Sequence, residues 1–100
     1  MINLQFEYVG EVKVNWMLDD NIDTERTVQI DSMPKGTSLD TVLYAKDGYI
    51  FNKAQLAKDG VIDPNWNPEI GFNHLLVQVD NVTADSIVII ATVKINEASS

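Results

Sequence analysis

The stretch Ser86-Ile-Val-Ile-Ile-Ala-Thr-Val-Lys-Ile95 decides the fold, because its first half is apolar at successive positions. A strand with one buried face alternates apolar and polar residues, whereas a strand that is apolar on both sides is buried on both. We therefore expect Ser86–Ile95 to be the central strand of a sheet, with cover on each face.

Alternation of apolar and polar residues predicts half-buried strands in four other segments: 2–8, 11–18, 24–30 and 75–79. The polar residues 19–23 separate the second segment from the third, and their Asp and Asn side chains favour a chain reversal by bonding to nearby backbone. An antiparallel hairpin of 11–18 with 24–30 is therefore predicted. Residues 1–9 are expected to add an extra N-terminal strand.

A helix is predicted after this hairpin. Thr37 and Asp40 have the spacing of a capping box, in which each side chain bonds to the backbone amide of the other residue. The helix is expected to start near Ser38 and to end at Gly48, in the left-handed conformation that glycine adopts at low cost. Its apolar face would consist of Leu39, Val42 and Leu43.

The segment before the last two strands gives weaker signals. Lys53–Lys58, closed by Gly60, is predicted as a second short helix, with a strand as the alternative. Pro64 and Pro68 remove two backbone donors from the stretch Val61–Asn73, for which we expect a long irregular loop.

Together these elements predict an α+β fold of the β-grasp (ubiquitin-like) type, a mixed sheet with one covering helix. A β-sandwich is the alternative, because the expected helix is short. Residues 1–100 are interpreted as a single domain, with residues 96–100 as a solvated tail.

Composition excludes several classes of function. The 15 acidic and 7 basic residues give a net charge of −8, and the basic residues are scattered, so nucleic-acid binding and attraction to anionic membranes are disfavoured. No apolar run has the length needed to cross a bilayer. The absence of cysteine removes disulfides, thiolate zinc sites and cysteine nucleophiles.

One segment has part of a calcium-binding pattern. Asp19, Asn21 and Asp23 occupy positions 1, 3 and 5 of a calcium loop, where oxygen ligands can converge on one cation. The pattern then fails, because Thr24 stands where glycine is needed and Ile30 where the bidentate glutamate is needed. A solvated turn is the preferred interpretation.

Catalytic groups are sparse. His74 is the only histidine and has no second histidine with which to share a metal, so we assign it no role. The carboxylates of turns, such as Asp19 with Asp20 and Asp80 with Asp85, are interpreted as surface charge rather than as a glycosidase pair. We therefore expect no catalytic residues, no cofactor and no enzymatic activity.

Aromatic residues are the candidate partner-binding residues. Trp66 stands between two prolines in a polar loop, where a large indole has no evident structural reason to be. Exposed aromatic side chains are frequent anchors of interfaces. Trp66, Tyr49 and Phe72 are predicted to contact a protein or glycan partner, with packing of Trp66 onto the sheet as the alternative.

Residues 11–51 also contain a recognisable order of motifs. A strand ends in an aromatic residue and is followed by an acidic turn, a second strand, a Lys-Gly-Thr-Ser-Leu helix entry and a Gly-Tyr pair. This order resembles the mucin-binding-type and related β-grasp repeats of Gram-positive surface adhesins, although this chain lacks glycine in the acidic turn. The segments are Val12-Lys-Val-Asn-Trp16, Thr27-Val-Gln-Ile30, Pro34-Lys-Gly-Thr-Ser-Leu39 and Asp47-Gly-Tyr-Ile-Phe51.

Two functional hypotheses follow. The first, which the resemblance implies, is a non-catalytic binding module of a bacterial cell-surface protein that contacts a host glycoprotein or surface polymer. The second is a small phage or bacterial structural subunit, located in the virion or cytoplasm, that self-assembles as a homo-oligomer. The molar mass in solution distinguishes them, since only the second requires association of identical chains.

Overall fold

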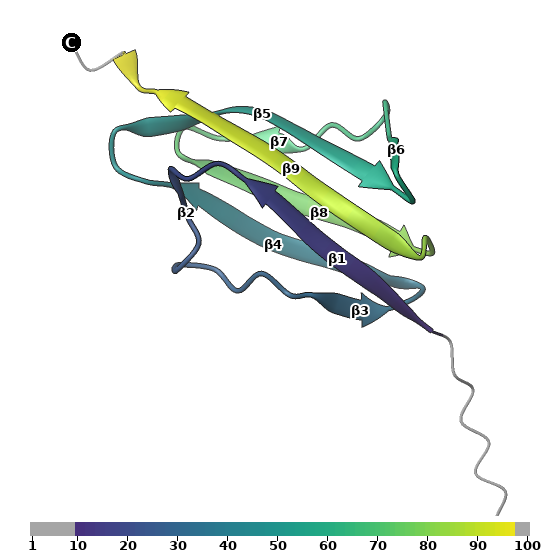
Figure 1. The fold of residues 1–100 in the computed structure, drawn as a ribbon. Helices are drawn as coiled ribbons and strands as arrows, with labels where there is room; N and C mark the ends of the chain where they lie inside the picture. Colours follow the sequence, from purple (N-terminus) through teal and green to yellow (C-terminus); the bar gives the residue numbers. More distant parts are fainter. Residues whose placement is uncertain (1–9, 98–100) are drawn as a thin grey trace, which may run out of the picture.

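The computed structural model describes residues 10–97, which form two β-sheets packed face to face (Figure 1). One sheet has five strands in the order β3-β1-β9-β5-β6, and the other has four in the order β2-β4-β8-β7. The strands are β1 (Glu11–Leu18), β2 (Ile22–Asp23), β3 (Ser32–Pro34), β4 (Thr37–Ala45), β5 (Tyr49–Lys58), β6 (Val61–Ile62), β7 (Glu69–Ile70), β8 (His74–Val82) and β9 (Ser86–Ile95).

The predicted α+β β-grasp fold is wrong, because the described residues contain no covering helix, and the alternative, a β-sandwich, is the observed architecture. The predicted helix from Ser38 to Gly48 is strand β4 and the turn that follows it. Leu39 and Leu43 lie four residues apart, which places them on one side of a helix but equally on one side of a strand. Strand β4 buries both of them against the other sheet.

The predicted hairpin of 11–18 with 24–30 is also wrong. After β1 the chain crosses to the other sheet, where β2 pairs with β4. The chain then returns as β3, which pairs antiparallel with the first three residues of β1. Residues 24–31 therefore connect two sheets, and their alternating pattern does not correspond to a strand.

Other predictions of elements are confirmed. Strand β9 occupies the third position of five, between β1 and β5, as expected for the central strand. It pairs in parallel with β1 and antiparallel with β5. The strand predicted at 75–79 lies within β8, whereas the predicted helix Lys53–Lys58 is wrong, because these residues belong to strand β5, as the alternative had it. The strand predicted in residues 1–9 lies outside the described residues, as does most of the predicted tail.

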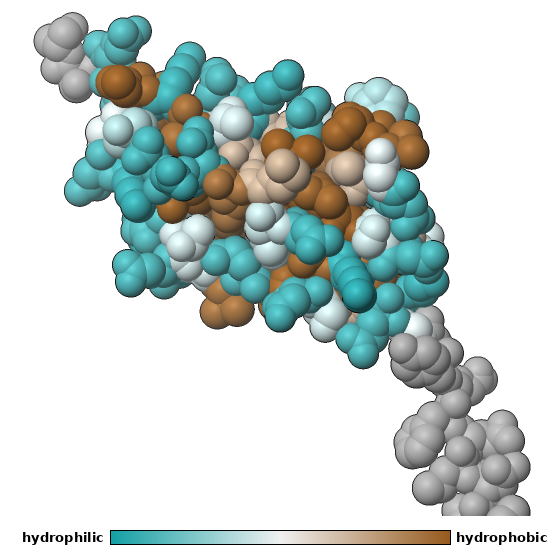
Figure 2. Space-filling model, viewed as in Figure 1, coloured by the Kyte–Doolittle hydropathy of each residue, from teal (hydrophilic) through white to brown (hydrophobic). Residues whose placement is uncertain are grey.

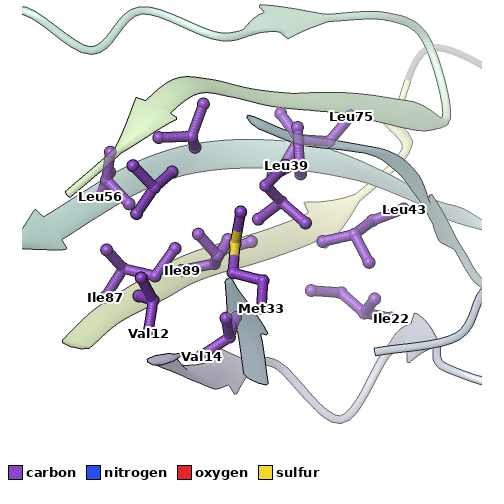
Figure 3. Packing of buried hydrophobic residues seen from close by; sticks show 14 of the residues in the cluster. Val12, Val14, Ile22, Met33, Leu39, Leu43, Leu56, Leu75, Ile87 and Ile89 are labelled. Carbon is purple, nitrogen blue, oxygen red and sulfur yellow. The ribbon is translucent and has the colours of Figure 1, made fainter. Parts of the chain in front are cut away.

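The core lies between the two sheets and is made entirely of apolar side chains. Alternate residues of each long strand point into it, since successive side chains of a strand face opposite sides. Figure 3 shows the side chains of both sheets meeting in this layer. The fully buried members include Val12, Ile22, Leu43, Leu56, Leu75, Val77, Ile87 and Ile89.

Candidate partner-binding surface

The outer side of the five-stranded sheet, here called the front face, carries an apolar row. Strand β9 points Val88 and Ile90 to this side, because the residues that alternate with them, Ile87, Ile89 and Ala91, are buried in the core. Pairing places Met17 of β1 and Gln55 of β5 on the two sides of Ile90, and Asn15 and Ala57 on the two sides of Val88. We define the apolar row as Met17, Ile90, Val88, Ala57 and Ile62.

The two ends of the apolar row are accessible to a partner. Met17 is 61% exposed and Ile62 43% exposed, while Val88 and Ile90 are half-buried and Ala57 is buried. Figure 2 shows apolar surface running along the middle of this face and continuing to one side of it. A shallow hollow beside the row is lined by Trp16, Met17, Ile90 and Thr92, among others. Contiguous exposed apolar surface of this kind marks interaction sites in soluble domains.

The apolar row bears on the prediction that both faces of β9 are covered. The apolar stretch predicted cover on each face of this strand, yet only one face is covered by the rest of residues 10–97. The uncovered side is the front face. The sequence therefore signals this surface, but the prediction of cover on both faces of β9 is wrong within residues 10–97.

Charges surround the apolar row. Lys13 and Glu11 point outward from β1, Lys53 from β5 and Lys94 from β9. Three lysines and one glutamate give the outward residues of these strands a net charge of +2. The outward strand residues of the front face are thus net positive within a chain whose net charge is −8, while Asp31 and Asp19 line the two hollows on this face.

The outer side of the four-stranded sheet, here called the back face, has the opposite charge. Its centre is apolar, since Val42 of β4 is paired with Leu76 of β8 and both are half-buried. Four carboxylates and no lysine point outward from its strands. These carboxylates belong to Asp23, Asp40, Glu69 and Asp80.

An aromatic group lies at one end of the back face. The guanidinium carbon of Arg26 lies 3.9 Å from the centre of the Tyr44 ring, a cation–π contact that covers the ring. His74 is the cross-strand partner of Tyr44, and its ring lies against Gly71. A side chain at position 71 would collide with this ring, since an added Cβ would lie closer to it than van der Waals contact allows.

The predicted contact residue Trp66 is half-buried and packs against the core. Its indole N–H donates to the carbonyl of Gln78 at 2.9 Å. Strand β7 pairs with β8 only at Leu75 and Leu76, so Trp66 satisfies a carbonyl of β8 beyond the end of β7. This placement favours packing of the loop over contact with a partner.

Asp63 shapes the loop that carries Trp66. Its carboxylate accepts a hydrogen bond from the Asn65 backbone N–H at 2.9 Å and lies 3.3 Å from the Lys58 ammonium. The backbone hydrogen bond, helped by Lys58, lowers the pKa of Asp63 below its ordinary value of 3.8, against a smaller effect of desolvation. The Lys35 ammonium lowers the pKa of Asp85 in the same direction through their ion pair.

The other two predicted contact residues differ from Trp66 in their placement. Tyr49 begins β5 and is half-buried against the core, whereas Phe72 is 67% exposed in the turn between β7 and β8. The β8 residue next to this turn is His74, four residues from Gln78, which corresponds to about 13 Å along a strand. The structure therefore does not gather Trp66, Tyr49 and Phe72 into one site.

The calcium-loop residues have structural partners. Asp19 accepts backbone hydrogen bonds from Asp20 at 3.1 Å and from Val93 at 3.2 Å, which extends the pairing of β1 with β9 beyond Leu18. Asp23 accepts from the Glu25 N–H at 3.1 Å. Asn21 accepts the Lys46 N–H through its backbone carbonyl. Within residues 10–97 no three His, Cys, Asp or Glu side chains are placed to hold a metal ion.

The turn between β5 and β6 contains a structural residue that the sequence signals but that was not predicted. Asp59 and Gly60 both have positive φ, 50° and 84°, as the favoured two-residue hairpin turn requires. The Asp59 carboxylate accepts the backbone N–H groups of Asp85 and Ser86, at 3.0 and 3.1 Å. The prediction that Gly60 closes a helix is wrong, and Asp-Gly is itself a strong hairpin signal.

Comparisons with known proteins give no assignment. No helix in residues 10–97 is long and apolar enough to cross a membrane. No protein family, curated protein or solved structure matches this chain.

Proposed function

We propose that this chain is a non-catalytic binding module of a bacterial cell-surface protein, and that it contacts a host glycoprotein or surface polymer through its front face. The observation that carries this proposal is the apolar row, which the fold leaves exposed along its central strand. The likeness of residues 11–51 to adhesin repeats supports the choice of partner class, although the β-grasp fold that it implied is wrong.

The chemistry of the front face suits an acidic glycoprotein. Met17 and Ile90 offer apolar contact area, and Lys13, Lys53 and Lys94 surround them with positive charge. Complementary charge speeds association and selects among partners.

Binding to immobilised mucin, measured by surface plasmon resonance, tests the proposal. The front variant Met17→Glu/Lys53→Glu places two carboxylates on the front face, and both positions are exposed. Its matched control is Val28→Glu/Lys46→Glu, which changes the net charge equally at exposed positions outside the strands. Binding of the wild type and of the control, with at least tenfold weaker binding of the front variant, is expected. Absent binding, or equal binding of both variants, would contradict the proposal.

The second candidate function is a small structural subunit that self-assembles. The observation that favours it is the opposite charge of the two outer faces, each of which has an apolar centre. One copy therefore carries both halves of a complementary contact.

A further inference from the structure

The charged residues of the two outer faces of the sandwich differ in sign, but both faces have an apolar centre with charged residues around it. The front face has a net charge of +2 around Met17, Val88 and Ile90. The back face has four carboxylates, with Arg26 as the cation above Tyr44, around Val42 and Leu76. Apolar surface would thus meet apolar surface, and lysines would meet carboxylates, if a front face were placed on a back face.

The same charges disfavour the symmetric alternatives. Two front faces would bring lysines against lysines, and two back faces would bring carboxylates against carboxylates, which raises the free energy of such contacts. A two-fold symmetric dimer uses the same patch on both copies, whereas a contact between different patches is repeated from copy to copy. The charge pattern therefore favours the repeated contact.

We propose that the front face of one copy docks on the back face of the next, so that identical chains associate front to back. The inference rests on the second candidate function and specifies its contact. The occupant of the apolar row is then a second copy of this chain. The lysines of one front face meet the carboxylates of the next back face; the lysines are Lys13, Lys53 and Lys94, and the carboxylates are those of Asp23, Asp40, Glu69 and Asp80.

The area of the contact sets its strength. Three long strands of about eight residues, at about 4.8 Å spacing and about 3.3 Å rise, present roughly 400 Å² per copy. A stable interface of standard size buries about 800 Å² per partner. Association is therefore expected to be weak and to depend on concentration, with a mass that rises from that of a monomer as the chain is concentrated.

The test uses two variants that each disable one face. The front variant is Met17→Glu/Lys53→Glu. The back variant is Asp40→Lys/Glu69→Lys, at two exposed positions of β4 and β7. The control for the front variant is Val28→Glu/Lys46→Glu, and the control for the back variant is Asp47→Lys/Glu97→Lys, with the same changes in net charge at exposed positions outside the strands. Circular dichroism establishes that each variant is folded.

Sedimentation velocity, with light scattering, measures the mass over a range of concentrations. Wild type and controls are expected to associate, each face variant is expected to remain a monomer, and an equal mixture of the two is expected to associate again. That last result is specific, since the mixture restores opposite charges across the contact whereas each variant alone places like charges on both of its outer faces. A wild type that stays monomeric, association that survives both variants, or a symmetric dimer would overturn the inference.

The failure of this inference can be distinguished from that of the glycoprotein proposal. A monomeric wild type that binds mucin and loses binding in the front variant refutes front-to-back association but supports the module. Association that follows the expected pattern, in a chain that does not bind mucin, supports the inference and refutes the module.

Discussion

The turn at Asp59 offers a quantitative test of the fold, because one side chain there has two separable structural roles. The Asp59 backbone adopts a left-handed conformation, with φ of 50°. The Asp59 carboxylate accepts hydrogen bonds from the backbone N–H groups of Asp85 and Ser86. Asp59 therefore joins the β5–β6 turn to the turn that precedes the central strand. Three substitutions at this position separate the two roles.

Asp59→Ala loses both roles. The left-handed conformation costs a residue such as alanine about 1–2 kcal/mol, and each lost hydrogen bond contributes about 0.5–1.5 kcal/mol, with water replacing part of it at this exposed site. We expect a total loss of about 2–3 kcal/mol in the free energy of unfolding. Asp59→Gly removes the backbone strain but not the loss of hydrogen bonds, so it should cost about 1–2 kcal/mol. Asp59→Asn retains an acceptor and tolerates the conformation, so it should cost less than about 1 kcal/mol.

Urea denaturation followed by circular dichroism measures these differences at constant m-value. The expected order of stability is wild type, Asn, Gly, Ala. Equal stability of the Ala variant and the wild type would refute the reasoning, because it would mean that neither the conformation nor the hydrogen bonds of Asp59 contribute.

Three further predictions concern the core, the Trp66 loop and acid. Ile89→Ala, in the core, should lower the free energy of unfolding by about 2–5 kcal/mol, while Ile90→Ala on the front face should cost markedly less; equal losses in urea denaturation would contradict the assignment of faces. Trp66→Phe should cost about 0.5–1.5 kcal/mol for the lost hydrogen bond and Trp66→Ala about 3–5 kcal/mol for lost packing, whereas a Trp66→Ala variant with unchanged melting would show that the indole does not pack. Because the pKa of Asp63 is lowered in the folded chain, its contribution to stability is full above its ordinary pKa of 3.8 and is lost as the pH falls through the lower folded value. Asp63→Asn should therefore flatten the dependence of the melting temperature on pH below about 4. A pH profile identical to that of the wild type would contradict this.

The sequence predicted the strands with unambiguous patterns. The first half of Ser86–Ile95 is apolar at successive positions, a pattern that favours a buried strand over an amphipathic helix. Its central place in the sheet was therefore predictable. Strand β4 was not, because Leu39 and Leu43 fit both periods and the Thr37–Asp40 spacing imitated a helix start. In the structure the Thr37 hydroxyl instead donates to the Pro34 carbonyl, within the turn before β4.

The arrangement of the sheets required information that lies outside local patterns. The parallel pairing of β1 with β9 joins residues more than seventy positions apart, and no turn signal specifies it. The crossing from β1 to β2 depends on Ile22, one buried side chain within a polar cluster. The front face was not predicted for a different reason: the apolar pattern of β9 predicts cover on both sides, but within residues 10–97 only one side is covered.

The measurement that tests the central claim most directly is a set of proton–nitrogen correlation spectra of the labelled chain, recorded from micromolar to millimolar concentration. The claim is that the front face is the contact surface of this protein. Concentration-dependent shifts at Met17, Val88 and Ile90 on the front face, with matching shifts at Val42 and Leu76 on the back face, are the predicted result. Shifts confined to other surfaces, such as the Phe72 turn, would contradict the claim. Spectra that change neither with concentration nor on addition of mucin would contradict it as well.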